Sequence, residues 1–444
     1  MTTTLSLTEM KVRELAQGVA SGAFTPNEVL EASLARIAEV EDRVQAWTIL
    51  DTEGARAQAA VLTAEAVAGK LRGPLHGVPF AIKDEFHIAG MPTLMRGESP
   101  PPEPADATCV ARLREAGAII VGKTTMPING KMPPTRNPWN LEHTAGGTSS
   151  GSGAAVGARM VPFAIGEQTA GSNLRPAAYN GVSGLKPTYG RISRFGCYPF
   201  AWSRDHVGLI GLDMADIALV LSVLAGPDPL DASAYNDPAP PADLDLSAYG
   251  TPRIGVVKNF FPERTGEVMQ GAVDSAAQRF VAAGAKVTDV MLPPEYALTW
   301  SAAAAIGAEG ATMHAGKAAA GNGWRTTELI PATYYIQARR IRTWLTEMLT
   351  KMYADVDALL MAVAPTPAPK GLASTGDASL LACWSYMGFP AITVNAGLSD
   401  ENLPLGLQLV GAPKTDYELM RLGAWCEDVL GLLPAPVVGA MPAV

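Results

Sequence analysis

The sequence is poor in the residue types that most often hold metals or cross-link small secreted proteins. Its 444 residues include five histidines and four cysteines. The cysteines are scattered and form no CxxC pair; they are Cys109, Cys197, Cys383 and Cys426. This spacing argues against a disulfide framework or a cysteine-rich metal site, and it favours reduced thiols in the cytoplasm.

Basic clusters and long apolar runs are missing as well. The formal net charge is −9 and no block of Lys and Arg occurs, which disfavours nucleic acid and anionic membranes as partners. No run of apolar residues is long enough to cross a bilayer, and the first residues do not resemble a secretory signal. Hydrophobic residues make up 48% of the chain and charged residues 17%. This composition predicts a large core and little disorder.

Short apolar runs rich in β-branched residues alternate with helical patterns along the chain. Thr25 and Glu28 have the spacing of a capping box at the start of one helix. The expected helices are 28–40, 109–116 and 268–283, and the expected strands are 78–82, 118–121, 161–165, 254–257, 391–394 and 405–410. The alternation predicts an α/β sheet with helices on its faces.

We expect residues 1–444 to form one domain. The Pro- and Asp-rich stretch at about 226–250 has the composition of a surface connection, and the tail after residue 433 is expected to fray. The strand and helix pattern resumes after the connection in the same style, which favours a long loop over a domain boundary.

Three short motifs fit known patterns in form but not in context. Gly117–Thr124 satisfies GxxxxGK[ST], yet its Ala-Ile-Ile-Val centre favours a strand over a phosphate-binding loop. Gly147–Gly151 satisfies GxSxG, but loop-like residues precede it, and only His206 and His314 follow to complete a triad. Gly151–Val156 lacks the final small residue of a dinucleotide-binding turn.

The Gly-, Ser- and Thr-rich run from Ala145 to Arg175, together with Lys83, carries the chemistry. Ser172 lies in a glycine-containing turn after an apolar strand, where the backbone N–H groups of residues 169–172 can converge on an oxyanion. A serine hydroxyl needs a base. Lys83 ends an apolar strand, and an apolar environment lowers a lysine pKa from about 10.4. A hydroxyl of the loop 146–152 can relay the proton. Taken singly, these features also fit a structural turn and a solvated lysine.

These segments resemble the amidase signature family. The resemblance includes GGTSSGSGAAV at 146–156, the long run at 162–193, GVPFAIKD at 77–84 and TRNPWN at 135–140. It extends to 117–124, 205–208, 357–367, 388–392 and 404–408, with the signature core at about 75–210. The resemblance implies one α/β domain with a mixed central sheet covered by helices on both sides. It also implies amide hydrolysis by a Ser–cis-Ser–Lys triad.

By position, the resemblance assigns Ser172 as nucleophile, Lys83 as base and Thr148 as the bridging hydroxyl. It also implies an oxyanion hole made by the backbone N–H groups of Thr169, Ala170, Gly171 and Ser172. The family normally has serine at the position of Thr148, and the extra methyl restricts its rotamers. Ser149 is the alternative relay, and Ser149 and Ser152 are expected to support the loop. Glu167-Gln168 stands where Thr-Asp is common, and Ala170 where glycine is common.

Several residues near these motifs are candidate substrate contacts. Arg175 can bind a substrate carboxylate or hold the loop, and we favour the structural role because polar loop residues usually satisfy backbone groups first. The remaining candidates are Met126, Tyr198, Phe200 and Trp202.

The sequence therefore predicts a cytoplasmic amidohydrolase acting on small-molecule amides, carbamates or esters, with no metal or organic cofactor and as a homodimer. One alternative is the glutamine-hydrolysing subunit of a tRNA-dependent amidotransferase, which works with partner subunits. The other is a catalytically weak binding protein on the same fold.

Overall fold

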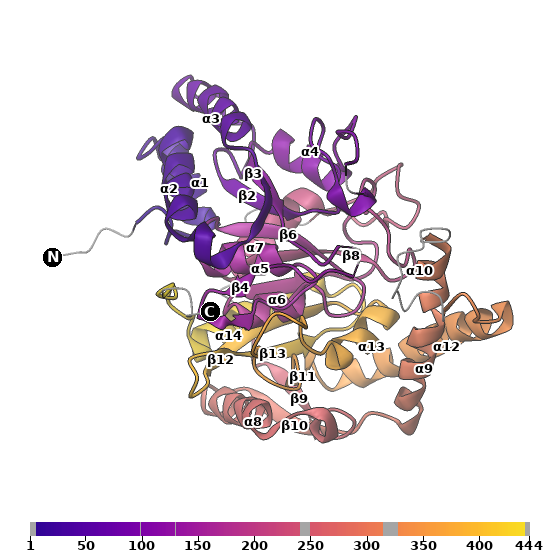
Figure 1. Cartoon of the computed structure of the whole chain (residues 1–444). Coiled ribbons are helices and arrows are strands. Elements are labelled where there is room, and N and C mark those ends of the chain that lie inside the picture. Colours follow the sequence, from indigo (N-terminus) through magenta and orange to yellow (C-terminus); the bar gives the residue numbers. More distant parts are fainter. Residues whose placement is uncertain (1–5, 98, 129, 240–248, 314–326, 440–444) are drawn as a thin grey trace.

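The centre of the structure is a twisted mixed sheet that runs through the whole molecule (Figure 1). The computed structural model describes residues 6–97, 99–128, 130–239, 249–313 and 327–439. Within these residues the main sheet has 11 strands in the order β1-β3-β2-β6-β8-β7-β12-β13-β11-β9-β10. The strands are β1 (Trp47–Leu50), β2 (Pro79–Lys83), β3 (Ile119–Thr124), β6 (Phe163–Gln168), β7 (Ser183–Lys186), β8 (His206–Gly211), β9 (Arg253–Val257), β10 (Lys286–Val290), β11 (Ala358–Ala362), β12 (Ala391–Leu398) and β13 (Pro404–Val410). All six expected strands are confirmed.

The sheet mixes parallel and antiparallel pairs, as predicted. β3, β2 and β6 run parallel to one another, and β11, β9 and β10 form a second parallel group. Between these groups, β6, β8, β7, β12, β13 and β11 pair antiparallel. A separate hairpin joins β4 (Arg136–Asn137) to β5 (Asn140–Thr144).

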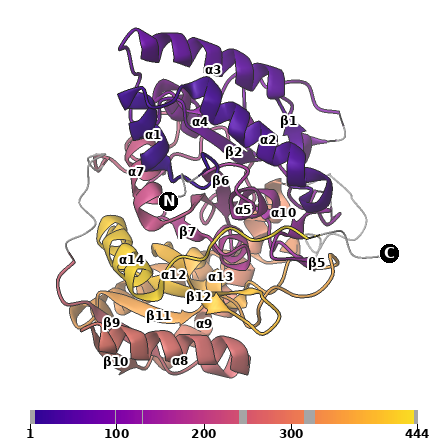
Figure 2. The same ribbon diagram turned by 90° about the vertical axis from the view of Figure 1, so that its left-hand side faces the viewer.

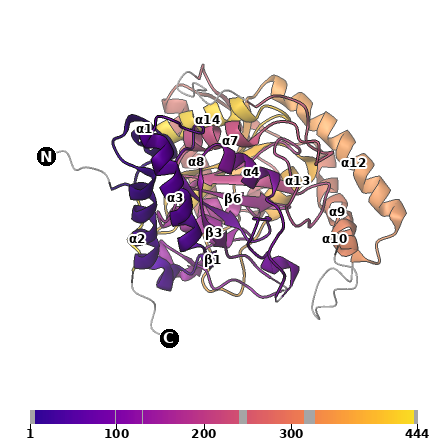
Figure 3. The same cartoon turned by 90° about the horizontal axis from the view of Figure 1, so that it is seen from above.

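Helices cover both faces of the sheet (Figures 1 and 2). They are α1 (Val12–Ser21), α2 (Pro26–Val44), α3 (Thr52–Val67), α4 (Thr108–Glu115), α5 (Ser150–Gly157), α6 (Leu174–Tyr179), α7 (Met214–Leu224), α8 (Glu267–Ala282), α9 (Leu298–Ala305), α10 (Gly307–Met313), α12 (Ala332–Thr350), α13 (Ser379–Met387) and α14 (Asp416–Leu430). The expected capping box at Thr25 and Glu28 is present at the start of α2. Seen from above, α9, α10 and α12 lie at the end opposite α1–α3 (Figure 3).

The buried apolar side chains form two core clusters of unequal size. The larger contains residues of α1, α4, α7, α8 and α14, and the smaller contains residues of α2, α3 and α5. In the part of the chain that the structure describes, no helix combines the length and apolar character needed to cross a membrane.

The strand interpretation of the P-loop-like motif is confirmed, because Ile119–Thr124 forms β3. Lys123 of that motif is buried and pairs with Asp84 at 3.1 Å. It also donates a hydrogen bond to the carbonyl of Pro92 at 2.8 Å. The lysine therefore stabilises the fold and is not available to a phosphate.

The connection and the tail differ in how they are held. The described parts of 226–250 contain no helix or strand, while 240–248 lies outside the described residues. The expectation of a frayed tail is wrong for residues 434–439. Arg43 donates to the carbonyls of Val438 and Gly439 at 2.7 and 3.0 Å, and Val438 packs into the smaller core cluster. Burial of an apolar side chain, which the Pro- and Ala-rich composition hides, fixes this segment.

Candidate active site

Neighbouring strands bring the predicted residues to one edge of the sheet. β2 and β6 are adjacent and parallel, with Ile82 opposite Ile165. Lys83 ends β2, and the loop that carries Ser172 begins where β6 ends at Gln168. Thr148 lies two residues before α5, which packs on β6. The carboxyl ends of parallel strands share an edge, so these residues meet there.

The loop 169–172 has all four of its carbonyl groups bonded to the protein. The donors are Arg204 Nε to Thr169 at 2.8 Å, Ser385 Oγ to Ala170 at 2.6 Å, the Arg175 N–H to Gly171 at 3.2 Å and the Ser149 N–H to Ser172 at 2.9 Å. By contrast, the four backbone N–H groups of this loop donate to no acceptor among the residues that the structure describes. Fixed carbonyls and free amides are the arrangement that an oxyanion hole requires.

Gln168 shapes the turn that follows. Its side-chain oxygen accepts hydrogen bonds from the N–H groups of Asn173 and Leu174 at 3.0 and 2.9 Å, and its amide donates to Ser385 at 3.0 Å. Ser385 thus links Gln168 to the carbonyl of Ala170. This glutamine, part of the Glu167-Gln168 departure noted in the sequence, links the turn that carries Ser172 to α13.

We expect Ser385→Ala to reduce kcat about tenfold with little change in KM. The substitution releases the Ala170 carbonyl. A less firmly held loop stabilises the oxyanion of the transition state less well, whereas binding of the neutral substrate is almost unchanged. Ser379→Ala, on the same helix, removes a hydroxyl for which the described structure records no hydrogen bond and is the matched control. Equal kinetics for the two variants would show that Ser385 does not position the loop.

Ser172 and Thr148 present free hydroxyl groups. Ser172 is 9% exposed and Thr148 is half-buried. Neither hydroxyl makes a hydrogen bond within the described part of the chain, to the other or to Lys83. The Gly147–Thr148 peptide bond is cis. Catalytic hydrogen bonds are often long before substrate binds, so the absence of these bonds is compatible with a proton relay through Thr148.

The other serines of the loop have hydroxyl groups that are already engaged. Ser149 Oγ accepts the N–H of Glu167 at 3.2 Å and donates to its carbonyl at 3.3 Å. Ser152 Oγ contacts Thr124 Oγ1 at 2.8 Å and the carbonyl of Ile165 at 3.1 Å. Both serines therefore connect the start of α5 to the sheet through hydrogen bonds, which is the role expected of residues that support the loop. Ser149 is poorly placed to act as the relay.

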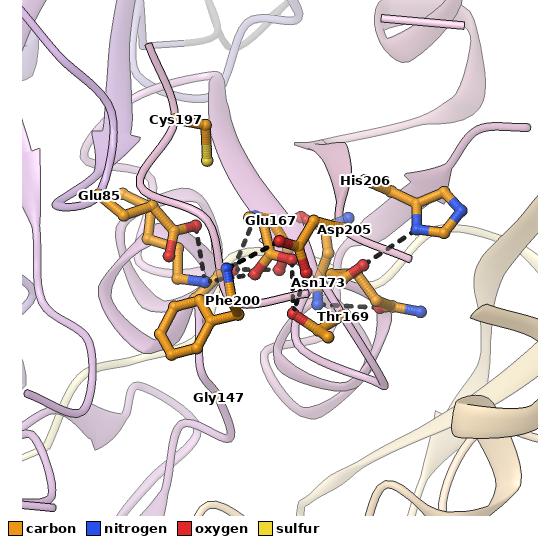
Figure 4. Close-up of polar contacts among 12 residues, drawn as sticks. Glu85, Gly147, Glu167, Thr169, Asn173, Cys197, Phe200, Asp205 and His206 are labelled. Atoms are coloured by element: carbon orange, nitrogen blue, oxygen red, sulfur yellow. Dashed lines mark hydrogen bonds and ion pairs between the residues drawn. The ribbon is translucent and has the colours of Figure 1, made fainter. Parts of the chain in front are cut away.

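The expectation that Lys83 lies in an apolar environment is wrong. Its side chain is fully buried, but Nζ lies 2.9 Å from Glu85 Oε1 and 3.1 Å from Glu167 Oε2 (Figure 4). Burial by itself lowers the pKa of Lys83, yet the charges and hydrogen bonds of the two carboxylates outweigh it and raise the pKa above the ordinary value. The sequence places Glu85 two residues from Lys83, but only the pairing of β2 with β6 brings Glu167 to it.

A third carboxylate extends this cluster. Thr169 Oγ1 lies 2.8 Å from both Glu167 Oε1 and Asp205 Oδ1 (Figure 4). Asp205 Oδ2 accepts the N–H groups of Phe200 and Ala201 at 2.8 Å. Burial above all, and then the nearby charge of Glu167, raise the pKa of Asp205 to about 7.

A histidine-dependent triad finds no support in this geometry. His206 is buried in β8, and its Nδ1 lies 3.1 Å from the carbonyl of Gln168 (Figure 4). The ring thus contacts backbone rather than the hydroxyl of Ser149. His314 lies outside the described residues.

The sequence matches the Amidase family over residues 28–420. The chain belongs to the amidase family. It is 34% identical over 487 residues to a glutamyl-tRNA(Gln) amidotransferase subunit from Anaeromyxobacter sp. (strain K), with 97% of this chain and 98% of that protein covered.

Solved structures agree with this membership of the amidase family. One is an inhibitor-bound vestigial protein complex that reveals the evolutionary origins of an s-triazine catabolic enzyme. It is 31% identical with a TM-score of 0.88 and covers 96% of this chain and 100% of that chain. Another is the peptide amidase of Stenotrophomonas maltophilia, which is 28% identical with a TM-score of 0.83 and covers 97% and 99% of the two chains.

Within the candidate site, the side chain of Arg175 donates its hydrogen bonds to other residues of the protein. Its guanidinium donates to the carbonyls of Gly147 and Gly376 at 2.6 and 2.8 Å and to Thr375 Oγ1 at 3.1 Å. The bond to Gly147 holds the residue that precedes Thr148. These contacts favour the structural role over binding of a substrate carboxylate.

Among the residues that the structure describes, three of the other candidate substrate contacts each line a different cavity. Met126 is buried beside a cavity of about 380 Å³ that Leu94 and Met132 also line. Tyr198 lines a cavity of about 600 Å³ next to His87. Trp202 lines a third, of about 280 Å³, together with Asp205 and Cys197.

Sequence reasoning assigned no role to five residues that shape the candidate site: Glu85, Glu167, Arg204, Asp205 and Ser385. The two glutamates carried a signal, because Glu167 departs from the common residue and Glu85 lies beside the lysine motif. Arg204 and Ser385 carried none, since each acts through a backbone carbonyl that is distant in sequence.

Proposed function

We propose that this chain hydrolyses the C–N bonds of small-molecule amides through an acyl-enzyme on Ser172. The observation that carries the proposal is the loop 169–172, in which four bonded carbonyls leave four amides free beside a nearly buried serine hydroxyl. Pre-fixed donors of this kind stabilise charge that develops in the transition state, commonly the largest single contribution to acyl-transfer catalysis.

The proposed roles follow from position. Ser172 attacks the substrate carbonyl, and Thr148 relays its proton toward Lys83. The oxyanion lies on the amides of Thr169, Ala170, Gly171 and Ser172. The relayed proton then reaches the leaving amine, and water resolves the acyl-enzyme. The residues around Lys83 are buried, which keeps bulk water away from this proton path.

Substrates in the proposed class include amides, carbamates and esters, since all three present a carbonyl to the same nucleophile. We place the protein in the cytoplasm as a homodimer, and the four unpaired cysteines agree with a reducing compartment. The likeness to an amidotransferase subunit over almost the whole of both chains supports a second candidate, hydrolysis of glutamine within a larger complex.

The test is a panel of amides, carbamates, esters and glutamine assayed with the purified chain, with Ser172→Ala as the blank. Turnover of a small amide that the blank lacks supports the first candidate. Glutamine hydrolysis that requires added partner subunits, which form a complex with this chain in gel filtration, supports the second candidate. Binding of panel members without turnover would leave only the third interpretation, a binding protein on this fold.

A further inference from the structure

The proposed function leaves a chemical difficulty at Lys83, and the inference here rests on that function. A lysine that takes a proton from Thr148 must first have lost one. In this chain Nζ is enclosed by Glu85 and Glu167 at 2.9 and 3.1 Å, with all three side chains buried. Two carboxylates favour the charged ammonium, which has no free electron pair.

The two carboxylates around Lys83 are not equivalent. Glu167 has more partners, because Oε2 accepts from Lys83 and Oε1 shares the hydroxyl proton of Thr169 with Asp205. Glu85 is fully buried, and among the described residues neither of its oxygens accepts a hydrogen bond of good geometry. The ion pair recorded for Glu85 joins it to the Lys83 ammonium. A buried anion with so little compensation is the better proton acceptor of the two.

We propose that Glu85 is the proton store of this site and that Lys83 passes protons to it without having to exist as a free amine. As the Ser172 Oγ–H bond breaks and Oγ bonds to the carbonyl carbon, the serine proton goes to Thr148 Oγ. In the same step the Lys83 ammonium gives one proton to Glu85, and the electron pair that this frees on Nζ takes the proton of Thr148. The negative charge thus moves from Glu85 to the oxyanion.

The reverse transfer completes the cycle. When the intermediate collapses, the proton on Glu85 returns through Lys83 and Thr148 to the leaving nitrogen, and the C–N bond breaks. Glu85 is again an anion beside the ammonium, and the same store serves the attacking water. Glu85 acts through Lys83 and is therefore a positioning residue rather than one that touches the reacting atoms.

The surrounding charges agree with a store that works at mildly alkaline pH. The charged groups around Glu85 include Lys83 on β2, Glu167 on β6 and Asp205 before β8, with the thiol of Cys197 nearby (Figure 4). Lys123 on β3 also interacts with Glu85 through its charge. Burial above all raises the pKa of Glu85 to about 8, with Lys83 opposing and the charges of Glu167 and Asp205 adding to the effect. General bases work best when their pKa lies near the working pH.

The direction of the pH effect follows from that raised pKa. Below about pH 8 Glu85 is protonated and cannot accept another proton. The serine is then not activated, so the rate falls as the pH falls. Above that value the rate reaches a plateau. A lysine acting alone, with its pKa raised by two carboxylates, would instead give a rate that keeps rising at alkaline pH.

The experiment measures the second-order rate constant for modification of the full-length protein by a fluorophosphonate between about pH 6 and pH 10. This reagent reports serine activation without knowledge of the substrate. The wild type should show an acid limb that ends near pH 8 and then a plateau. Glu85→Gln should react about 10²-fold more slowly at pH 9 and lack the inflection, because general-base assistance contributes about 10²–10⁴-fold.

Two further variants make the result specific. Glu427→Gln removes another buried carboxylate whose pKa burial raises to about 8, but that residue lies on α14 and bonds Ser183 and Met214; it should leave the profile unchanged. Glu85→Asp keeps a carboxylate and should keep the inflection at a lower rate. If Glu85→Gln does not give the wild-type circular dichroism spectrum, the inflection in the pH profile of Glu85→Asp is the deciding measurement.

The outcomes separate this inference from the proposed function. A wild type that is not modified at Ser172 contradicts the proposed function itself. A modified wild type whose rate and inflection survive in Glu85→Gln overturns the proton store alone. A faster Glu85→Gln variant also overturns it, because the carboxylate would then only restrain the lysine.

Discussion

Replacing Ser172 with alanine is expected to lower kcat/KM by about 10⁴-fold or more while the protein stays folded. The substitution removes the atom that bonds the substrate carbonyl, so only binding and the oxyanion amides remain to assist the reaction. The serine hydroxyl makes no hydrogen bond among the described residues, so its loss leaves no partner unsatisfied. The measurement is kcat/KM on the best panel substrate, with thermal unfolding of both proteins.

Ser149→Ala is the matched comparison for this prediction. Its hydroxyl bonds the backbone of Glu167, so the variant should lose about 1–2 kcal/mol of unfolding free energy and retain measurable activity. The opposite pattern, an inactive Ser149→Ala beside an active Ser172→Ala, would favour the GxSxG interpretation and remove Ser172 from the chemistry.

Lys83→Met is expected to abolish activity and to lower the free energy of unfolding by about 3–5 kcal/mol. The substitution leaves Glu85 and Glu167 buried without their shared counter-ion, and loss of one partner of a buried pair has a cost of this size. Urea unfolding at about pH 9, where Glu85 is ionised, measures the effect. The deficit should shrink as the pH falls below about 8, because Glu85 with its raised pKa is then protonated in the folded state and carries no uncompensated charge.

The triple variant Lys83→Met, Glu85→Gln, Glu167→Gln tests the cause of that instability. Neutral side chains of similar size remove the unpaired charges, so most of the lost unfolding free energy should return while activity stays absent. If Lys83→Met unfolds like the wild type, or if the triple variant is no more stable than Lys83→Met, the ion-pair cluster does not contribute as the structure indicates.

Local sequence signals were sufficient for the strands and for the nucleophile loop. β2 and β6 are short apolar runs with polar residues at their ends, and such runs specify a buried strand and a turn wherever they pair. The Ser172 turn was predictable for the same reason, since its glycine and hydroxyl residues lie within one segment. The resemblance to a known family added the expected role of Thr148.

The environment of Lys83 could not be predicted in this way. An apolar strand before a lysine indicates burial, but it does not reveal which carboxylates approach across the sheet. Glu167 reaches Lys83 because β6 is the neighbour of β2, and this pairing is set by the whole topology. The cavities show the same limit, because Met126 and Trp202 lie near the motifs in sequence yet face different spaces.

The most direct test of Ser172 as nucleophile is peptide mapping by mass spectrometry after treatment with a fluorophosphonate. The wild type should gain a single adduct, located on Ser172, and Ser172→Ala should gain none. A protein that stays unmodified across the active pH range, or one that carries its adduct on Ser149, would contradict the mechanism proposed for this site.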